Sequence, residues 1–339
     1  MSDHKNTELY YSDKAAMLLQ DMPSYVKMYI RAIHNRTSPR TRYEYLKDIQ
    51  CFLDYAKDIF DTESIEVDDL KKFSKINFEE YFEYLEHYEK NGKECTNGRT
   101  SIKRKLSSLR KFFAYLFENE MIPSDEIRKV EMPKLHKKEI IRLDTDEAVN
   151  FLNAVEKGGT LTEKEQAYHN IQSVRDSALV YLMLTSGIRV SECSELDITD
   201  IDIDKCCIHI IRKGGDEATV YFSDEAAAYI KDYLAWRADT LKNCNEKALF
   251  ISSRKQRLSV RSIEVLIKKY AARAVPLKHI TPHKLRSTFA TNLYNETGDI
   301  YLVAETLGHK DVTTTKDHYA NLSDKRKEEN RNRVQFRKG

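Results

Sequence analysis

An apolar repeat of helical period runs through most of this chain and limits what it can fold into. It is clearest between Arg99 and Phe117, where apolar residues recur on one side of the predicted helix. The same pattern follows Ser38-Pro39 and covers Phe78 to Tyr88. With only 10 Gly and 6 Pro among 339 residues, the chain is neither disordered nor a many-turned all-β protein. We therefore predict a mainly α-helical fold.

The length of the chain and one polar stretch predict two domains. A chain of 339 residues exceeds the usual size of a single domain. Residues 123–141 contain two Pro and a basic run, as linkers often do. We expect an N-terminal extension at 1–22, a helical domain at 23–122, the linker at 123–141, a second domain at 142–320 and a C-terminal tail at 321–339.

A short β-rich segment interrupts the helices of the second domain. An apolar helix from Val174 to Thr185 is predicted to end at Gly187. Two β-rich runs, at residues 206–212 and 218–222, then flank Lys213-Gly214-Gly215-Asp216, which is a hairpin signal. The second domain is thus predicted to be mixed α/β, mostly helical with a small antiparallel sheet.

Charge and cysteine content exclude several classes of protein. The formal net charge is only +2, so binding to nucleic acid has to depend on local patches. No apolar run approaches the length of a membrane span, and the polar N-terminus shows no secretory signal. The six Cys form no Cys-x-x-Cys motif, which is typical of a reduced protein. We expect a cytoplasmic protein without a cofactor, a metal site or a membrane partner.

The helix predicted at Arg99 to Phe117 has a second face that is entirely basic. Its span contains six cations and no acid, whereas a solvated helix face usually mixes both signs. This favours contacts with DNA phosphates, although a solvated face remains an alternative. The candidate DNA-binding residues are Arg40, Arg42, Arg99, Lys103, Arg104 and Lys105.

Residues 281–319 gather side chains that suit a phosphate site. A helix is predicted to start at Thr281-Pro282 and to carry His283 and Arg286 on one face. A second helix, Asp299 to Leu307, is expected to end at Gly308. The next residue, His309, would then lie just past a helix end, and Tyr319 would lie on a third helix. Imidazoles, a guanidinium and a phenol in this arrangement predict a phosphate site with a nucleophile.

Three earlier residues of the second domain extend this site. Arg189 follows the turn at Gly187, and Glu192 is close enough in sequence to hold its guanidinium toward a phosphate. Lys213, at the tip of the hairpin, would be a proton donor if the hairpin closes over the site. Each residue taken singly also suits a purely structural role, so the prediction depends on the combination.

These motifs resemble the signature of the tyrosine recombinase (phage integrase) family. The resemblance covers residues 23–320, and the first domain resembles the four-helix core-binding domain of that family. Tyr319 is one residue further from His309 than in many members, a spacing also found among integrases of mobile elements. The matching residues are Arg189 in SGIRVSECSEL, Lys213 in IIRKGGDEATVYF, His283 and Arg286 in TPHKLRSTFATNL, His309 in LGHKDVTTT, and Tyr319.

The resemblance implies a site-specific DNA recombinase that works through a 3′-phosphotyrosyl intermediate. Within the family the chain is most similar to Xer-type single recombinases, which resolve chromosome dimers. Tyr319 would be the nucleophile, and Lys213 would protonate the departing 5′-oxygen. The resemblance assigns phosphate binding to Arg189, Arg286 and His309, assistance of the nucleophile to His283 and a supporting role to Glu192, without a metal ion.

The implied partners are double-stranded DNA and three further copies of the chain, as a homotetramer on two DNA sites. The C-terminal tail would be exchanged between protomers through Val334 and Phe336. An accessory or DNA-translocase protein remains open. The alternatives are a mobile-element integrase, a type IB topoisomerase, a DNA-binding protein without catalysis and a phosphate-binding structural protein.

Overall fold

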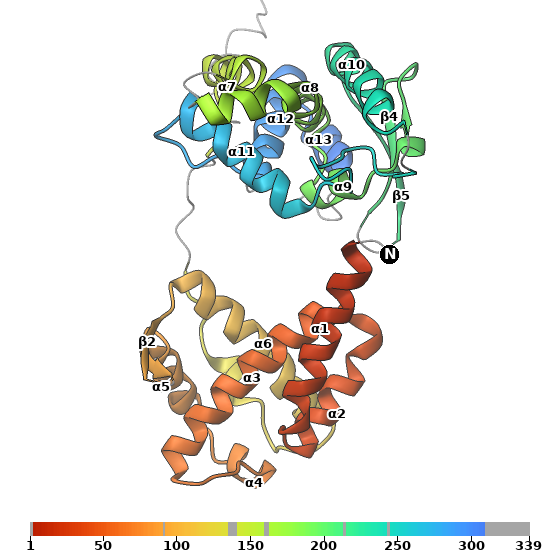
Figure 1. The fold of residues 1–339 in the computed structure, drawn as a ribbon. Helices are drawn as coiled ribbons and strands as arrows, with labels where there is room; N and C mark the ends of the chain where they lie inside the picture. Colours follow the sequence, from red (N-terminus) through yellow and green to blue (C-terminus); the bar gives the residue numbers. More distant parts are fainter. Residues whose placement is uncertain are drawn as a thin grey trace, which may run out of the picture. The chain divides into compact units, whose positions relative to one another are not determined.

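The computed structural model describes residues 3–90, 92–134, 141–158, 163–212, 215–242 and 245–308. Of residues 3–7, 90, 164, 165 and 168 it describes the backbone alone. The chain divides into two compact units, Met1–Lys138 and Glu139–Gly339 (Figure 1). Each unit has its own hydrophobic core. The predicted fold class is confirmed, because both units are mainly helical and carry small antiparallel sheets.

The first unit is a helical bundle built around α3, which packs against α1 and α6. Ser38 caps α3 by accepting a hydrogen bond from the main-chain nitrogen of Thr41 at 3.3 Å, and Pro39 occupies the first turn. Phe52 lies in the centre of the core, edge-on to the rings of Tyr81 and Phe113. Its elements are α1 (Asp3–Gln20), α2 (Ser24–Ala32), the 3-10 turn η1 (His34–Arg36), α3 (Pro39–Phe60), α4 (Val67–Leu70), α5 (Lys75–Tyr84), β1 (His87–Lys90), β2 (Lys93–Thr96), α6 (Arg99–Glu118) and η2 (Glu126–Lys129).

The first unit differs from the sequence prediction after α5. The helix predicted from Phe78 to Tyr88 ends at Tyr84, and β1 and β2 then form an antiparallel hairpin. Asn91-Gly92 separates these strands, and this dipeptide is a strong hairpin signal that the helical periodicity concealed. Within the residues expected to form the N-terminal extension, α1 packs against α3. Its contacts include Tyr11 against the ring of Tyr43.

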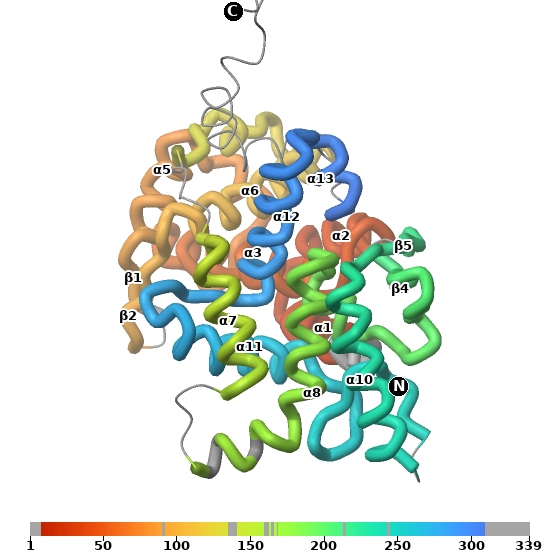
Figure 2. The backbone as a smooth tube through the Cα atoms, turned by 90° about the horizontal axis from the view of Figure 1, so that it is seen from above, coloured from red at the N-terminus to blue at the C-terminus, as the bar shows by residue number. Residues whose placement is uncertain are grey.

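The second unit is organised around α8, which contacts α7, α10 and α12. Figure 2 shows α7 and α10 flanking α8, and Figure 1 shows β4 and β5 beside α10. The sheet has the order β3-β4-β5 and is antiparallel throughout, with Ile211 opposite Glu217 at the hairpin end. Its elements are α7 (Thr145–Lys157), α8 (Glu163–Ser186), α9 (Val190–Glu195), η3 (Ile198–Asp200), β3 (Ile201–Asp202), β4 (Cys207–Ile211), β5 (Glu217–Tyr221), α10 (Asp224–Thr240), α11 (Val260–Ala274), α12 (Pro282–Thr297) and α13 (Ile300–Leu307).

Local capping signals define the two helices that precede His309. Thr281 is the N-cap position of α12, although its side chain makes no capping hydrogen bond, and Pro282 occupies the first turn. Asp299 caps α13 through the main-chain nitrogens of Tyr301 and Leu302. Gly308 ends α13 in the left-handed conformation, with φ 62°. The predicted positions of both helices are therefore confirmed.

Candidate functional site

Arg189 lies at the start of α9, directly after the sharp turn that ends α8. Glu192 holds it in two ways: one carboxylate oxygen accepts from the main-chain nitrogen of Arg189 at 2.9 Å, and the other accepts from its guanidinium at 2.7 Å. The Glu192 side chain is only 7% exposed, whereas that of Arg189 is 31% exposed. A buried carboxylate thus orients a guanidinium that still reaches the surface.

The turn before Arg189 requires glycine. Gly187 has φ +63°, and a Cβ at this position would overlap the ring of Phe289 on α12. The hydroxyl of Ser186 accepts a hydrogen bond from the main-chain nitrogen of Ile188 at 3.3 Å and so closes the turn. The close approach of α12 to this turn therefore depends on the absence of a side chain at Gly187.

Arg286 joins this turn to the end of α13. Its guanidinium is buried and donates hydrogen bonds to the main-chain carbonyls of Gly187 and Leu307. These carbonyls lie two residues before Arg189 and His309, respectively. The structure thus brings Arg189, Arg286 and the end of α13 to one place, although they are far apart in the sequence.

Arg212 is a further basic residue at this place, and it was not among the predicted site residues. It directly follows β4, and its guanidinium donates to the carbonyl of Thr306 on α13 at 3.1 Å. The same guanidinium lies against Gly308, since a Cβ there would overlap it. The only sequence signal was its position next to Lys213.

The remaining predicted site residues fall into two groups. His283 is exposed on the first turn of α12, one turn before Arg286. Lys213, His309 and Tyr319 lie outside the described residues. Among the residues that the structure does describe, no group of three or more His, Cys, Asp or Glu side chains could hold a metal ion.

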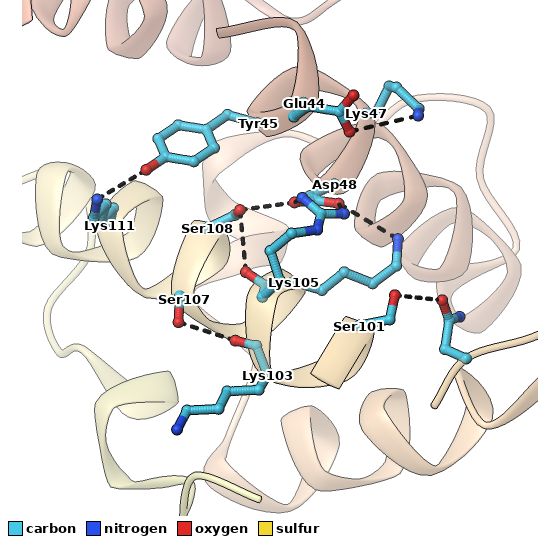
Figure 3. A network of polar contacts seen from close by, with 12 residues as sticks. Glu44, Tyr45, Lys47, Asp48, Ser101, Lys103, Lys105, Ser107, Ser108 and Lys111 are labelled. Atoms are coloured by element: carbon cyan, nitrogen blue, oxygen red, sulfur yellow. Dashed lines mark hydrogen bonds and ion pairs between the residues drawn. The ribbon is translucent and has the colours of Figure 1, made fainter. Parts of the chain in front are cut away.

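The basic face of α6 has an acidic partner that the sequence did not reveal (Figure 3). Asp48 on α3 is 1% exposed and forms a two-pronged ion pair with Arg104, with N–O distances of 2.6 and 2.8 Å. Lys105 lies 3.4 Å from the same carboxylate, and the hydroxyl of Ser108 donates to it at 2.7 Å. The absence of acids between Arg99 and Phe117 therefore did not mean that the cations of this span lack carboxylate partners.

The six predicted DNA-binding residues consequently differ in exposure. Arg42 is buried and donates to the carbonyls of His34 and Thr37, and Lys105 is buried beside Asp48. Arg40 and Arg99 are exposed, and Lys103 is partly exposed. Arg104 keeps 47% of its side chain exposed despite its ion pair. Arg42 and Lys105 thus have roles inside the unit, whereas the other four present charge at the surface.

Comparison with known proteins defines the class to which this architecture belongs. Residues 141–326 match the phage integrase family, and residues 26–120 match the SAM-like N-terminal domain of phage integrases. The tyrosine recombinase XerS of Streptococcus agalactiae serotype III (strain NEM316) is 32% identical over 335 residues, which span 89% of this chain and 93% of the relative. The chain therefore belongs to the phage integrase family of tyrosine recombinases, which cleave and rejoin DNA.

Solved structures agree with this assignment at the level of the fold. The XerH site-specific recombinase bound to its palindromic difH substrate has a TM-score of 0.69 and 18% identity, covering 95% of this chain and 88% of that one. A lambda integrase tetramer bound to a Holliday junction has a TM-score of 0.59 and 16% identity, covering 86% and 77%. The similarity to XerS, and not these structures, supports the predicted Xer-type site-specific recombinase, and it does not support the mobile-element and topoisomerase alternatives. Within the described parts of the chain, no helix is long and apolar enough to cross a membrane.

Proposed function

We propose that this chain resolves chromosome dimers in the cytoplasm, by metal-independent strand exchange through a 3′-phosphotyrosyl intermediate. One observation carries the proposal: Arg286 joins the turn before Arg189 to the helix end before His309. This arrangement brings together the chain segments that carry these cations, and a phosphodiester in its transition state requires such cations around it. The XerS relative supports the choice of subgroup.

The reaction has to store the energy of the broken phosphodiester, because no other energy source is supplied. The phenol oxygen of Tyr319 attacks the scissile phosphorus, a P–O bond to tyrosine forms, and the bond to the 5′-oxygen breaks. A phenol with a pKa of about 10 needs help to lose its proton near neutral pH, and His283 provides it. Lys213 gives a proton to the departing 5′-oxygen. Attack by a 5′-hydroxyl reverses these steps and rejoins the DNA.

Arg189, Arg286 and His309 stabilise the charge that builds on the non-bridging oxygens. The carbonyls of Gly187 and Leu307 fix the guanidinium of Arg286 where these segments meet. Arg189 is held by Glu192 and keeps an exposed side. Two fixed guanidiniums supply the positive charge that a metal ion provides in other phosphoryl-transfer enzymes.

The first unit binds DNA through the exposed cations of α3 and α6. Arg40, Arg99, Lys103 and Arg104 carry this proposal, since Arg42 and Lys105 are buried. Replacing Arg99 and Lys103 by Gln should weaken DNA binding. The slope of the logarithm of the binding constant against the logarithm of the salt concentration should become smaller by about one for each cation lost. Lys72→Gln, an exposed lysine paired with Asp69, is the matched control and should leave the salt dependence unchanged.

Strand exchange requires four active sites on two duplexes, so we propose a homotetramer on DNA. The lambda integrase tetramer on a Holliday junction has the same fold and supports this assembly. Residues 321–339, with Val334 and Phe336, would be exchanged between protomers. An accessory or DNA-translocase protein would then select chromosome dimers as the substrate. Removal of residues 321–339 should abolish cooperative assembly on DNA and leave binding to a single site.

A nicked suicide substrate tests the central chemistry. The wild-type chain should form a covalent adduct with a cognate site, because the nicked strand leaves and rejoining fails. Tyr319→Phe should abolish the adduct while binding to the same DNA persists. Tyr301→Phe, which changes an exposed tyrosine of α13, is the matched control and should retain the adduct. An adduct in the Tyr319→Phe protein would refute the assignment of the nucleophile.

A further inference from the structure

Arg212 links two parts of the candidate site, the end of strand β4 and the end of helix α13. Its main chain closes the β4–β5 hairpin, since its nitrogen donates to Asp216 at 2.8 Å and its carbonyl accepts from Gly215 at 3.0 Å. Its side chain leaves the hairpin and donates to Thr306 on α13. Arg212 thus lies at the end of β4, just before Lys213, and contacts the end of α13, just before His309.

The end of α13 receives two guanidiniums on consecutive carbonyls. The last four carbonyls of a helix have no partner within it, and they carry the negative end of the helix dipole. Arg212 donates to Thr306, and Arg286 donates to Leu307. Gly308 then turns the chain with φ +62° and leaves space for the Arg212 guanidinium, which a Cβ would overlap. The glycine and the arginine therefore fit each other.

Stability alone is a weak explanation for this arginine. Its Nε is buried and has no hydrogen-bond partner in the described part of the chain. A buried donor without a partner costs free energy, and such groups often mark sites where geometry matters more than stability. The position of this guanidinium therefore calls for an explanation beyond the strength of its contacts.

We infer that Arg212 is a positioning residue for the recombination reaction. It fixes the strand end that leads into Lys213 against the helix end that leads into His309. Arg212 thereby keeps the strand end and the helix end together when DNA binds, and these are the described ends that precede the proposed proton donor and phosphate-binding residue. The inference rests on the proposed roles of Lys213 and His309, and it assigns no contact between Arg212 and the substrate.

DNA in which sulfur replaces the bridging 5′-oxygen of the scissile phosphate distinguishes a positioning role of Arg212 from a general loss of structure. A thiolate leaves without protonation, so a variant that fails only because the proton donor is displaced should recover on such DNA. Arg212→Gln and Gly308→Ala disturb the same contact from its two sides. We expect each to slow single-turnover cleavage of ordinary DNA by about 100-fold, the usual effect of a small misplacement. On the thiol substrate Arg212→Gln should cleave within a few-fold of the wild type, whereas Gly308→Ala, which also disturbs the helix end before His309, should recover less.

Three comparisons make the result decisive. Arg261→Ala, at an exposed arginine of α11, is the matched control and should cleave both substrates normally. Combining Arg212→Gln with Lys213→Ala should slow cleavage no further than Lys213→Ala alone, because both act on one step. If Lys213→Ala recovers on the thiol substrate and Arg212→Gln does not, this inference alone is wrong. If neither recovers, the proton-donor role of Lys213 fails, and the positioning role of Arg212 fails with it.

Discussion

Arg286 donates a hydrogen bond to the main-chain carbonyl of Leu307, the last residue of α13. Its other terminal nitrogen donates to Gly187, so one side chain spans two segments that are distant in sequence. A planar fork with fixed donor directions is needed for this, and an ammonium group cannot replace it. The candidate site therefore depends on the shape of Arg286 as well as on its charge.

Arg286→Lys should impair both catalysis and stability. Loss of one preorganised donor to a transition state usually slows a reaction by about 100- to 1,000-fold. A buried carbonyl left without a donor costs about 1–3 kcal/mol of unfolding free energy. Trp236 on α10 is the single tryptophan of the chain, so its fluorescence reports denaturant unfolding of the second unit. Near-normal cleavage by this variant would contradict the proposed role.

His283→Ala should separate catalysis from stability at the same helix. The side chain is exposed, so the unfolding free energy should change by no more than about 0.5 kcal/mol. Loss of a proton-transfer group usually slows the chemical step by about 100-fold or more. Single-turnover cleavage and Trp236 fluorescence measure the two effects. Equal cleavage by the variant and the wild type would remove His283 from the mechanism.

Gly187→Ala should destabilise the second unit by two separate effects. The left-handed backbone costs about 1–2 kcal/mol for a residue with a Cβ. The overlap with Phe289 adds about 1–3 kcal/mol, as overpacking usually does. Gly215→Ala is the matched control, because Gly215 has φ +89° but a Cβ added there would meet no atom within 4 Å. It should show the backbone cost alone, and equal losses in both variants would exclude the overlap with Phe289.

Local sequence signals predicted the helices that carry the site. The proline at 282 indicated the start of α12 and the glycine at 308 indicated the end of α13, because capping depends on residues that are close in the sequence. The apolar stripe of α6 is likewise buried as predicted. Helical period and capping thus identified the mainly helical fold class and the elements that hold Arg189 and Arg286.

Interactions between distant segments were beyond the reach of those signals. Asp48 neutralises Arg104 from another helix, and nothing in the sequence around either residue indicates the pairing. Arg212 is similar, since its partner Thr306 is far along the chain. The β1–β2 hairpin was missed for a different reason: its Asn-Gly turn signal was present, but the surrounding helical pattern outweighed it.

Asp48→Asn should destabilise the first unit and leave buried positive charge without a partner. Removing one partner of a buried ion pair usually costs about 3–5 kcal/mol, and we expect about 3 kcal/mol because Arg104 is half-exposed. Scanning calorimetry of the full chain should show a lower melting temperature for one of two transitions. Glu44→Gln is the control, since Glu44 pairs with Lys47 at the surface, 3.6 Å away, and such pairs contribute little. Equal melting temperatures for both variants would show that Asp48 is not a structural anchor.

Cys193, next to Glu192 on α9, should make the stability of the second unit fall in alkaline solution. Burial, with a smaller contribution from Glu192, raises the pKa of this thiol from 9.0 to about 12. Above its ordinary pKa the unfolded chain loses a proton that the folded chain keeps, so unfolding becomes easier as pH rises. The stabilisation is complete below pH 9 and is lost progressively toward pH 12.

Comparison of two variants isolates the contribution of this thiol. Cys193→Ala should remove up to about 1.4 kcal/mol per pH unit from the slope of unfolding free energy above pH 9. Ile188→Val removes a methylene from the same buried region without removing the thiol, so it should lower stability and keep the wild-type slope. Denaturant unfolding followed by Trp236 fluorescence at several pH values measures both slopes. If Cys193→Ala and the wild type have the same slope, the thiol ionises at similar pH in both states, and its burial does not govern the alkaline limit.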